Sequence, residues 1–268
     1  MYHDLSQKGY THKKLKETFG TTLYHQRFVG YGLTKEKFAK LQEILEYQIP
    51  TIPNPHGIKP KFLEKNEKLA ELIGIILGDG GMSKNSIVIS IHSENKEYIR
   101  KVTILINDVF SYAPKYHKRK NKNVIDVKVH SQGIVLSLLN LGLDTGNKVK
   151  KQVNIPKWIK KNDSFFIACV RGLIDTDGYI GKYVKKRGKY TWFQYHVGFD
   201  NYSLNLLSDF VEFCNRFDIP VSRTSKYKVI IGSRRGVLRI LKITQPFKLK
   251  NIKFDLNELG KHLANIPS

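Results

Sequence analysis

The chain has 268 residues, of which 41% are hydrophobic, so it can bury a core and form one large domain or two smaller ones. Its 46 lysine and arginine residues outnumber 23 aspartate and glutamate residues, which gives a formal net charge of +23. Such an excess favours a polyanionic partner, most often nucleic acid, and we expect no membrane association because no apolar span or basic amphipathic helix stands out.

The chain has two cysteines, Cys169 and Cys214, and no Cys-x-x-Cys motif. Both fall in helical apolar patterns and are interpreted as buried thiols, which suits a reducing compartment. The start of the chain, residues 1–4, does not resemble a signal peptide. We therefore expect a cytoplasmic, nucleoid-associated protein or one of an organellar matrix, and not a secreted one.

Residues 1–47 predict a small, separate helical segment. Two short helical patterns flank Gly9, and Thr34–Tyr47 forms another with one apolar face. The segment resembles a helix-turn-helix, whose second helix would enter the major groove; a helical cap packed on the main domain is an equal alternative. Residues 48–61 contain four prolines and predict an extended linker.

An apolar helical pattern follows from Asn66, which is a good N-cap residue, to Gly80, which we expect as the C-terminal cap. Small residues at every fourth position, Ala70, Gly74 and Gly78, leave a smooth stripe along this helix. Such a stripe allows a second helix to approach with its backbone unusually close.

The sequence after this helix predicts further helices and strands up to residue 147, where we end the first repeat, which begins at residue 62. The hairpin strands alternate apolar and polar residues, and the helices have the helical period. The predicted elements are a strand at Ser86–His92 with a short partner at Met82–Lys84, a helix at Asn95–Phe110, a hairpin at Lys115–His130 and a helix at Gln132–Leu141.

Residues 148–162 connect this half to a second one at residues 163–268. The second half opens with another apolar helix, expected to begin at Ser164 and to end at Gly178. Its small residues occupy the positions that match the first stripe: Ala168, Gly172 and Thr176.

The same order of elements then recurs, so helix, hairpin, helix, hairpin and helix occur twice in the chain. We predict an α+β fold in which each sheet is covered by helices on one face and open on the other. The predicted elements are paired strands at Tyr179–Val184 and Tyr190–Asp200, a helix at Ser203–Phe217, paired strands at Val221–Ser225 and Lys228–Ile231, and a helix at Arg234–Ile243.

Each of the two apolar helices ends in Asp-Gly, at Asp79 and Asp177. A carboxylate is disfavoured at a helix C-terminus, where the helix dipole is negative and the last carbonyls lack partners. If the helices pack side by side in parallel, both carboxylates and several carbonyls meet at one end. Such a cluster of hard oxygen ligands suits Mg²⁺. One Asp-Gly alone would indicate an ordinary turn, but two matched copies favour the metal site.

Basic residues gather on the predicted hairpins, with aromatic residues between them. A two-stranded ribbon fits the major groove, so these hairpins predict DNA binding on the open sheet faces. The candidate DNA-binding residues are Lys118, Arg119, Lys120, Lys122, Lys128, Lys182, Lys185, Lys186, Arg187, Lys189, Arg223, Lys226 and Lys228.

The two stretches that end in Asp79 and Asp177 resemble the paired motifs of LAGLIDADG homing endonucleases, in the form with two motifs in one chain. The resemblance implies two pseudo-symmetric αββαββα repeats that form a DNA-binding saddle. The family binds its catalytic metals with the last acid of each motif. Two departures, Leu77 for the first acid of the first motif and Arg171 for the alanine of the second, leave both metal-binding acids in place.

The resemblance also implies further site residues. The backbone carbonyls of Gly78 and Thr176 would complete the metal shells, with Mg²⁺ as cofactor and Mn²⁺ as a substitute. The segment around Lys250 resembles the family's active-site lysine segment, and the internal repeat extends that role to Lys150; two ordinary surface lysines are the alternative. The family's polar residue near the second helix of each repeat falls at Ser93 and Asn201.

We therefore expect a monomeric, Mg²⁺-dependent endonuclease that cuts both strands of a long, non-palindromic DNA target. The same fold and charge suit an intron maturase that binds intron RNA, or a DNA-binding regulator that does not cut. The Asp-x-Lys pattern of Asp126 and Lys128 could in principle mark an unrelated nuclease core.

Overall fold

The structure, a computed structural model, describes residues 8–19, 43–44, 60–187 and 190–251. The chain divides into two compact units, Met1–Phe62 with Ser131–Leu141, and Leu63–His130 with Gly142–Ser268. Most of the predicted N-terminal helical segment and of the predicted linker at residues 48–61 lies outside the described residues. No described helix combines the length and the apolar character that crossing a membrane requires.

The first unit contains helix α2 (His12–Phe19) and helix α6 (Gln132–Asn140). Leu15 of α2 is fully buried. Helix α6 begins at Ser131, whose hydroxyl accepts a hydrogen bond from the backbone N–H of Ile134. The segment before the first motif joins this unit, because the N–H of Lys61 donates to the carbonyl of Gly133 over 3.2 Å.

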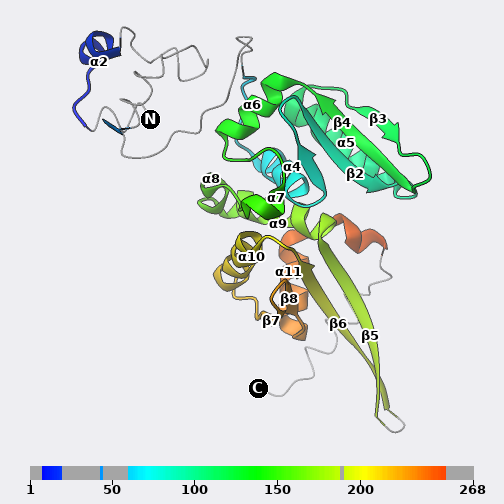
Figure 1. The fold of residues 1–268 in the computed structure, drawn as a ribbon. Coiled ribbons are helices and arrows are strands. Elements are labelled where there is room, and N and C mark those ends of the chain that lie inside the picture. Colours follow the sequence, from blue (N-terminus) through cyan, green and yellow to red (C-terminus); the bar gives the residue numbers. More distant parts are fainter. Residues whose placement is uncertain (1–7, 20–42, 45–59, 188–189, 252–268) are drawn as a thin grey trace. The chain divides into compact units, whose positions relative to one another are not determined.

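The second unit contains both motif helices and two four-stranded antiparallel sheets (Figure 1). Its first half consists of α4 (Glu67–Leu77), β1 (Gly80–Met82), β2 (Ser86–His92), α5 (Lys96–Phe110) and the hairpin of β3 (Lys115–Lys118) with β4 (Val124–His130). The short helices α7 (Lys148–Lys151) and α8 (Lys157–Lys160) lead to the second half. That half consists of α9 (Asp163–Thr176), β5 (Gly178–Arg187), β6 (Tyr190–Asp200), α10 (Leu204–Arg216), β7 (Ser222–Ser225), β8 (Lys228–Ile231), α11 (Arg234–Thr244) and the 3₁₀ helix η2 (Phe247–Asn251).

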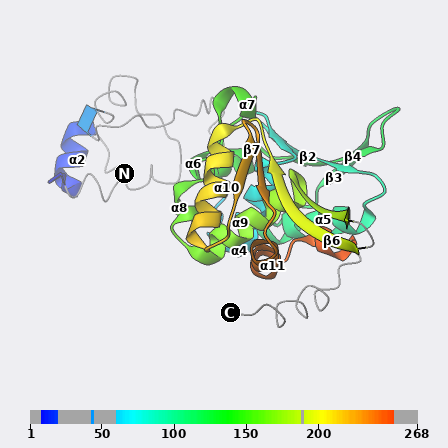
Figure 2. The same ribbon diagram turned by 90° about the horizontal axis from the view of Figure 1, so that it is seen from below.

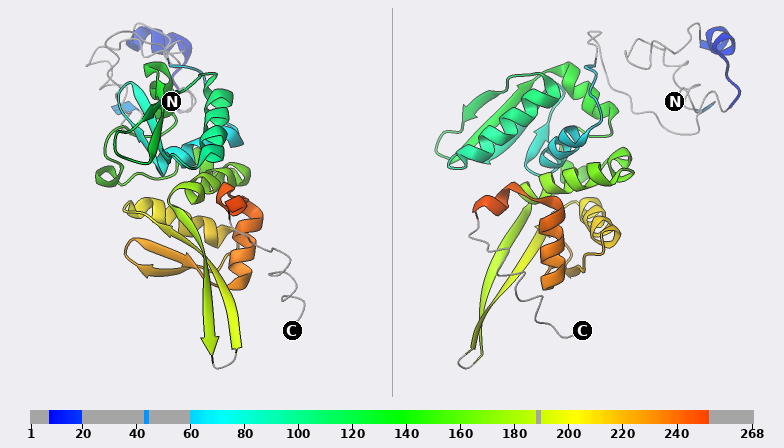
Figure 3. Two further views of the ribbon diagram at one scale, coloured as in Figure 1. Left: turned by 90° about the vertical axis from the view of Figure 1, so that its right-hand side faces the viewer. Right: turned by 180° about the vertical axis from the view of Figure 1, so that it is seen from behind.

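The two sheets have the same topology, with strand orders β1-β2-β4-β3 and β5-β6-β8-β7. With helix α6 included, the order αββαββα occurs twice along the chain, so the predicted α+β fold of two repeats is confirmed. Side chains alternate between the two faces of each strand. One face of the first sheet is buried in the core and carries Ile87, Ile89 and Val127. Helix α5 lies along one face of the first sheet, and α10 and α11 cover one face of the second (Figures 2 and 3).

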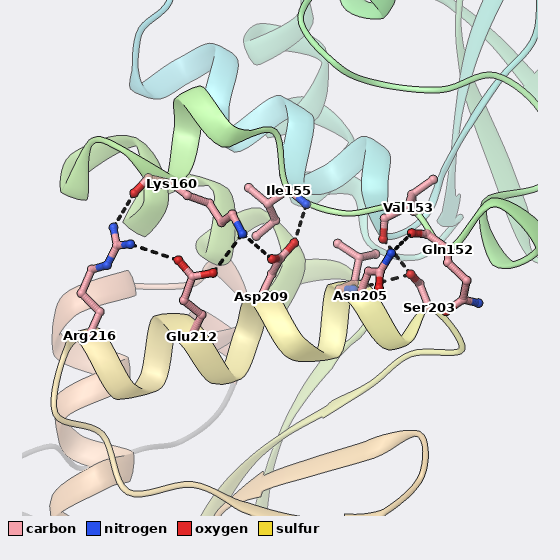
Figure 4. Close-up of polar contacts among 10 residues, drawn as sticks. Gln152, Val153, Ile155, Lys160, Ser203, Asn205, Asp209, Glu212 and Arg216 are labelled. Atoms are coloured by element: carbon pink, nitrogen blue, oxygen red, sulfur yellow. Dashed lines mark hydrogen bonds and ion pairs between the residues drawn. The ribbon is translucent and has the colours of Figure 1, made fainter. Parts of the chain in front are cut away.

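Polar contacts join the inter-repeat segment, residues 148–162, to helix α10 and its N-cap residue Ser203 (Figure 4). The carboxylate of Asp209 accepts the backbone N–H of Ile155 at 2.6 Å and lies 2.7 Å from the amine of Lys160. The hydroxyl of Ser203 donates to the carbonyl of Val153 at 2.7 Å. These contacts hold the predicted linker at residues 148–162 as an ordered part of the second unit.

Three predicted boundaries of the motif helices differ from the structure. Helix α9 begins at Asn162, whose side chain caps the N–H of Phe165, two residues before the predicted cap Ser164. Gly80 and Gly178 are not C-terminal caps but the first residues of β1 and β5. Neither can carry a side chain, because an added Cβ would lie 2.5 to 2.6 Å from the backbone of Ile76 or Ile174. The two glycines therefore allow the chain to turn sharply from the helix into the following strand.

Candidate active site

The candidate site lies where α4 and α9 end. The two helices pack against each other along their small residues. A Cβ on Gly74 would lie 2.0 Å from the carbonyl oxygen of Cys169, and a Cβ on Gly172 would lie 2.4 Å from that of Glu71. The predicted smooth stripes are thus in contact, and the aspartates that follow them, Asp79 and Asp177, are close enough to influence each other's charge.

Asp177 is the C-cap residue of α9 and is partly buried. Burial, followed by the negative charge of Asp79, raises the pKa of Asp177 to about 6, while Lys148, a hydrogen bond from Asn201 and Lys248 act in the opposite direction. Asp79 opens to solvent, yet partial desolvation raises its pKa as well, against the charges of Lys248 and Lys148. Two carboxylates with raised pKa values at one end of a helix pair attract a cation.

Two lysines occupy the ends of the motif helices. The Nζ of Lys148 lies 2.8 Å from the carbonyl oxygen of Leu77 and also contacts that of Gly78. The Nζ of Lys248 lies 2.8 Å from the carbonyl oxygen of Thr176 and also contacts that of Gly178. Burial lowers the pKa of both amines, and the nearby aspartates oppose that effect. The lysines thus act as cationic caps on the negative ends of both helices.

The lysines assigned from the family resemblance, Lys150 and Lys250, lie elsewhere. Both side chains are exposed, and the Nζ of Lys250 lies 5.0 Å from the ring centroid of Phe247. In each Lys-x-Lys pair it is the first lysine, not the predicted second one, whose amine contacts the carbonyls at the end of a motif helix. Because residues two apart in a short helical turn point in different directions, only the first lysine, Lys148 or Lys248, reaches the aspartates.

Of the two predicted polar residues, Asn201 reaches an aspartate: its Nδ2 donates to the carboxylate of Asp177 at 2.6 Å. Ser93 occupies the corresponding place in the hairpin but has no such contact among the described residues. The register explains the difference. Asn201 lies two residues beyond the strand partner of Gly178, whereas Ser93 lies four residues beyond the strand partner of Gly80.

A charge network beneath the aspartates was not predicted. The buried carboxylate of Asp175 lies 3.0 Å from the amine of Lys101 and accepts the backbone N–H of Lys248 at 3.1 Å. Lys101 also lies 2.7 Å from Glu71, which pairs at 3.0 Å with Arg171. Arg171 is one of the two departures from the family motif, and its guanidinium group pairs with Glu71. Asp175 therefore fixes the backbone of Lys248.

The predicted DNA-binding residues divide between the two faces of the sheets. Strand register places Arg119, Lys128 and Lys228 on the faces opposite the buried side chains. Lys120 and Lys122 are exposed in the β3–β4 turn, and Lys226 lies in the β7–β8 turn. Three predicted residues share the register of the helix-covered faces instead: Lys118, Lys182 and Arg223. The side chains of the four remaining predicted residues lie outside the described part: Lys185, Lys186, Arg187 and Lys189.

The donor chemistry of the site fits Mg²⁺. The two carboxylates and the carbonyls of Gly78 and Thr176 are hard oxygen ligands, and each of those carbonyls already accepts a lysine ammonium group, which shows that this end favours cations. The described residues contain no group of three or more His, Cys, Asp or Glu side chains arranged for a metal ion. A metal here would therefore depend on backbone oxygens in addition to Asp79 and Asp177.

The fold and the site define a two-repeat protein with one acidic motif per repeat. A comparison with protein families finds a match in the second repeat. Residues 165–245 match the family model described as a LAGLIDADG-like domain. This region runs from α9 to the end of α11 and so includes Asp177 and Asn201. The predicted resemblance to the LAGLIDADG family is confirmed over these residues.

Curated relatives resemble part of the chain at low identity. The chain is 27% identical over 170 residues to the replication factor C small subunit of Methanocaldococcus jannaschii, covering 63% of this chain and 9% of that protein. It is 28% identical over 135 residues to the ATP-dependent DNA helicase Hel308 of Thermococcus kodakarensis, covering 49% of this chain and 12% of that protein. An uncharacterised protein of Methanocaldococcus jannaschii is 24% identical over 175 residues, 62% of each chain. The chain thus spans less than two thirds of each of these relatives.

Solved structures with a similar arrangement include the I-LtrWI LAGLIDADG homing endonuclease bound to target DNA, with a TM-score of 0.49, 12% identity, and coverage of 75% of this chain and 92% of that chain. The N-terminal LAGLIDADG domain of WhiA has a TM-score of 0.45 and 17% identity, with coverage of 73% and 86%.

Proposed function

We propose that this protein is a Mg²⁺-dependent, site-specific DNA endonuclease that hydrolyses one phosphodiester on each strand of a long double-stranded target. The observation that carries the proposal is the convergence of Asp79 and Asp177 at the ends of two closely packed helices, each beside a partly buried lysine. One chain contains both half-sites, so the active form is a monomer. The two repeats differ in sequence, so the target is not palindromic.

The residues of the site have distinct roles in this proposal. Asp79 and Asp177 hold the metal ions together with the carbonyls of Gly78 and Thr176, and Asn201 keeps the carboxylate of Asp177 in one orientation. Bound Mg²⁺ supplies Lewis-acid stabilisation of the charge that develops on a phosphodiester.

The lysines contribute charge that needs no metal. Their lowered pKa values come from burial, and the adjacent aspartates keep the ammonium forms favourable. Lys148 and Lys248 would leave the helix carbonyls for a phosphate oxygen when DNA arrives, because a phosphate carries a full negative charge and a carbonyl only a partial one. Asp175 holds the backbone of Lys248 in place during that exchange.

The test uses DNA duplexes selected from a random library by the purified full chain, and then incubated with Mg²⁺ or with EDTA. The wild type should cut both strands only with Mg²⁺. Asp79→Asn and Asp177→Asn should each bind the selected duplex and fail to cut both strands, whereas Asp144→Asn, at an exposed carboxylate in a loop, should behave as the wild type. If either site variant cuts both strands at the wild-type rate, the shared-site mechanism is wrong, and Asp126 with Lys128 becomes the next candidate.

One observation favours a second function, a DNA-binding protein that does not cut. The ammonium groups of Lys148 and Lys248 already occupy the Gly78 and Thr176 carbonyls that we assign to the metals. If these contacts persist on DNA, the site is satisfied without metal. The same experiment separates the two functions, because such a protein would select a DNA sequence and leave both strands intact in Mg²⁺ and in Mn²⁺.

A further inference from the structure

The open face of the first sheet carries a buried carboxylate that the proposed cleavage does not use. Asp126 in β4 pairs in register with Ser90 of β2 on one side and with His117 of β3 on the other. Its neighbour Val127 points into the core, so Asp126 lies on the face away from that core, which it shares with Lys128. Its side chain is nevertheless only 6% exposed, because other polar groups surround it.

Those groups are arranged as a closed set of hydrogen bonds. The Nε of Arg119 donates to one carboxylate oxygen of Asp126 at 3.0 Å, and its Nη2 lies 2.8 Å from the other. The hydroxyl of Ser90 donates to Asp126 at 2.9 Å and accepts from the Nη2 of Arg119 at 2.8 Å. Burial alone would raise the pKa of Asp126, but the bonds from Arg119 and Ser90 outweigh it and lower the pKa, so the carboxylate stays ionised.

This arrangement fixes the guanidinium group of Arg119 before any ligand arrives. Two of its three nitrogens are held by Asp126 and Ser90, while the Nη1 amino group has no hydrogen-bond partner among the described residues. The side chain as a whole is 40% exposed. Arg223 in the second repeat differs, because within the described part of the chain its neighbours in sequence, Ser225 and Lys226, supply the carbonyls to which it donates.

The pairing with Asp126 changes what Arg119 can recognise. A phosphate is recognised mainly by net charge, which the exposed turn lysines Lys120 and Lys122 provide. The carboxylate of Asp126, which also lies 3.9 Å from the amine of Lys128, offsets the charge of Arg119. Arg119 is therefore a weaker phosphate site than a guanidinium group without a carboxylate partner, but its Nη1 amino group retains directed N–H donors. Directed donors suit a base edge, and guanine presents two acceptors, N7 and O6, in the major groove.

We infer that Arg119, oriented by Asp126 and Ser90, reads a guanine in the part of the DNA target that lies against the first repeat. Asp126 and Ser90 are positioning residues that act through Arg119. The inference rests on the DNA binding in the proposed function and requires no cleavage.

The experiment is selection of bound duplexes from a random double-stranded DNA library by the full chain, followed by sequencing. The wild type should enrich guanine at one position that Arg119→Lys and Asp126→Asn no longer enrich, with the other positions unchanged. Affinity for the wild-type site should fall about 10- to 100-fold in these variants, the effect of losing one directed base contact. Ser90→Ala should weaken the same preference to a smaller extent.

Lys120→Gln is the matched control, one residue further along the turn. It should lower affinity for all sequences alike. A uniform loss in the Arg119→Lys variant would mean a phosphate contact and would overturn the inference, as would a guanine preference that survives in it. These outcomes leave the proposed endonuclease intact. A wild type that binds no double-stranded DNA would overturn both proposals, and thermal melting of each variant confirms that it is folded.

Discussion

At the scale of single residues, Asp177 couples stability to pH. Its pKa in the folded protein is about 6, above the ordinary value of an aspartate, so the folded state binds a proton that the unfolded chain has already released between about pH 4 and pH 6. The free energy of unfolding in metal-free buffer therefore falls as pH rises through that window. Above pH 6 Asp177 is ionised in both states, and the loss of stability does not increase further.

Asp177→Asn removes this cost. In EDTA at pH 7.5 the variant should be more stable than the wild type by about 1 kcal/mol, less than the full shift implies because solvent reaches the carboxylate. The gain should disappear near pH 4. Urea unfolding at both pH values measures it. Equal gains at pH 4 and pH 7.5 would show that the carboxylate charge is not the cause.

The two lysine pairs offer a second comparison between single residues. Lys148→Met and Lys248→Met should each reduce cleavage of a selected duplex by about 10- to 100-fold, because a cationic group beside the reacting phosphate is lost. Lys150→Met and Lys250→Met are matched controls two residues away, with exposed side chains, and should cut at nearly the wild-type rate. Rates measured with all four variants at saturating Mg²⁺ decide the assignment. If Lys150→Met and Lys250→Met reduced cleavage more than Lys148→Met and Lys248→Met, the catalytic role would belong to Lys150 and Lys250.

At the scale of elements, the contact between α4 and α9 depends on the absence of side chains. Gly172→Ala would place a Cβ 2.4 Å from the carbonyl oxygen of Glu71 and 2.9 Å from the backbone nitrogen of Ile75. Alanine favours a helix over glycine by about 1 kcal/mol, but the clash with backbone atoms costs more. We expect a net loss of about 2 kcal/mol or more, seen as a lower melting temperature.

Gly81→Ala is the control for this prediction. Gly81 lies in β1, and a Cβ there would meet nothing within 4 Å. Its melting temperature should stay close to that of the wild type. A Gly172→Ala variant as stable as Gly81→Ala would mean that the helices can move apart without loss, which the close backbone approach at Gly172 argues against.

The elements themselves could largely be predicted, whereas their ends and partners could not. The strand at Ser86–His92 and the cap at Asn66 follow from alternation and capping chemistry and agree with the structure. The start of α9 was placed at Ser164 because Ser and Asn are both good caps, and only the backbone decides between them. Likewise, the Lys101 partner of Asp175 comes from a different helix, and no local pattern reveals a contact so distant in sequence.

At the scale of the whole molecule, the charge of +23 should govern DNA affinity. Each phosphate neutralised by a lysine or arginine releases counterions, so six to ten such contacts would lower affinity by roughly 1,000-fold or more between 50 and 200 mM salt. Binding measured as a function of salt gives the slope. Replacing Lys120 and Lys122 with Gln should reduce the slope by up to about 2, and an affinity independent of salt would contradict binding along the DNA backbone.

The repeat organisation was also visible in the sequence, since two motifs with matched caps, stripes and acids predict two similar halves. The register within each half was not visible. It separates Ser93 from Asp79 while bringing Asn201 to Asp177, and it turns Lys118 toward the helix-covered face. A shift of one or two residues along a strand has little signature in composition but decides which side chains meet.

The charge network beneath the aspartates makes the two repeats unsuitable as interchangeable modules. Lys101 of the first repeat pairs with Asp175 of the second, and Arg171 of the second pairs with Glu71 of the first. A chimaera that combines one repeat of this chain with the opposite repeat of a relative would leave a partly buried charge without its counterpart. Recombination between such genes would therefore yield folded hybrids mainly when these four positions are inherited as a set.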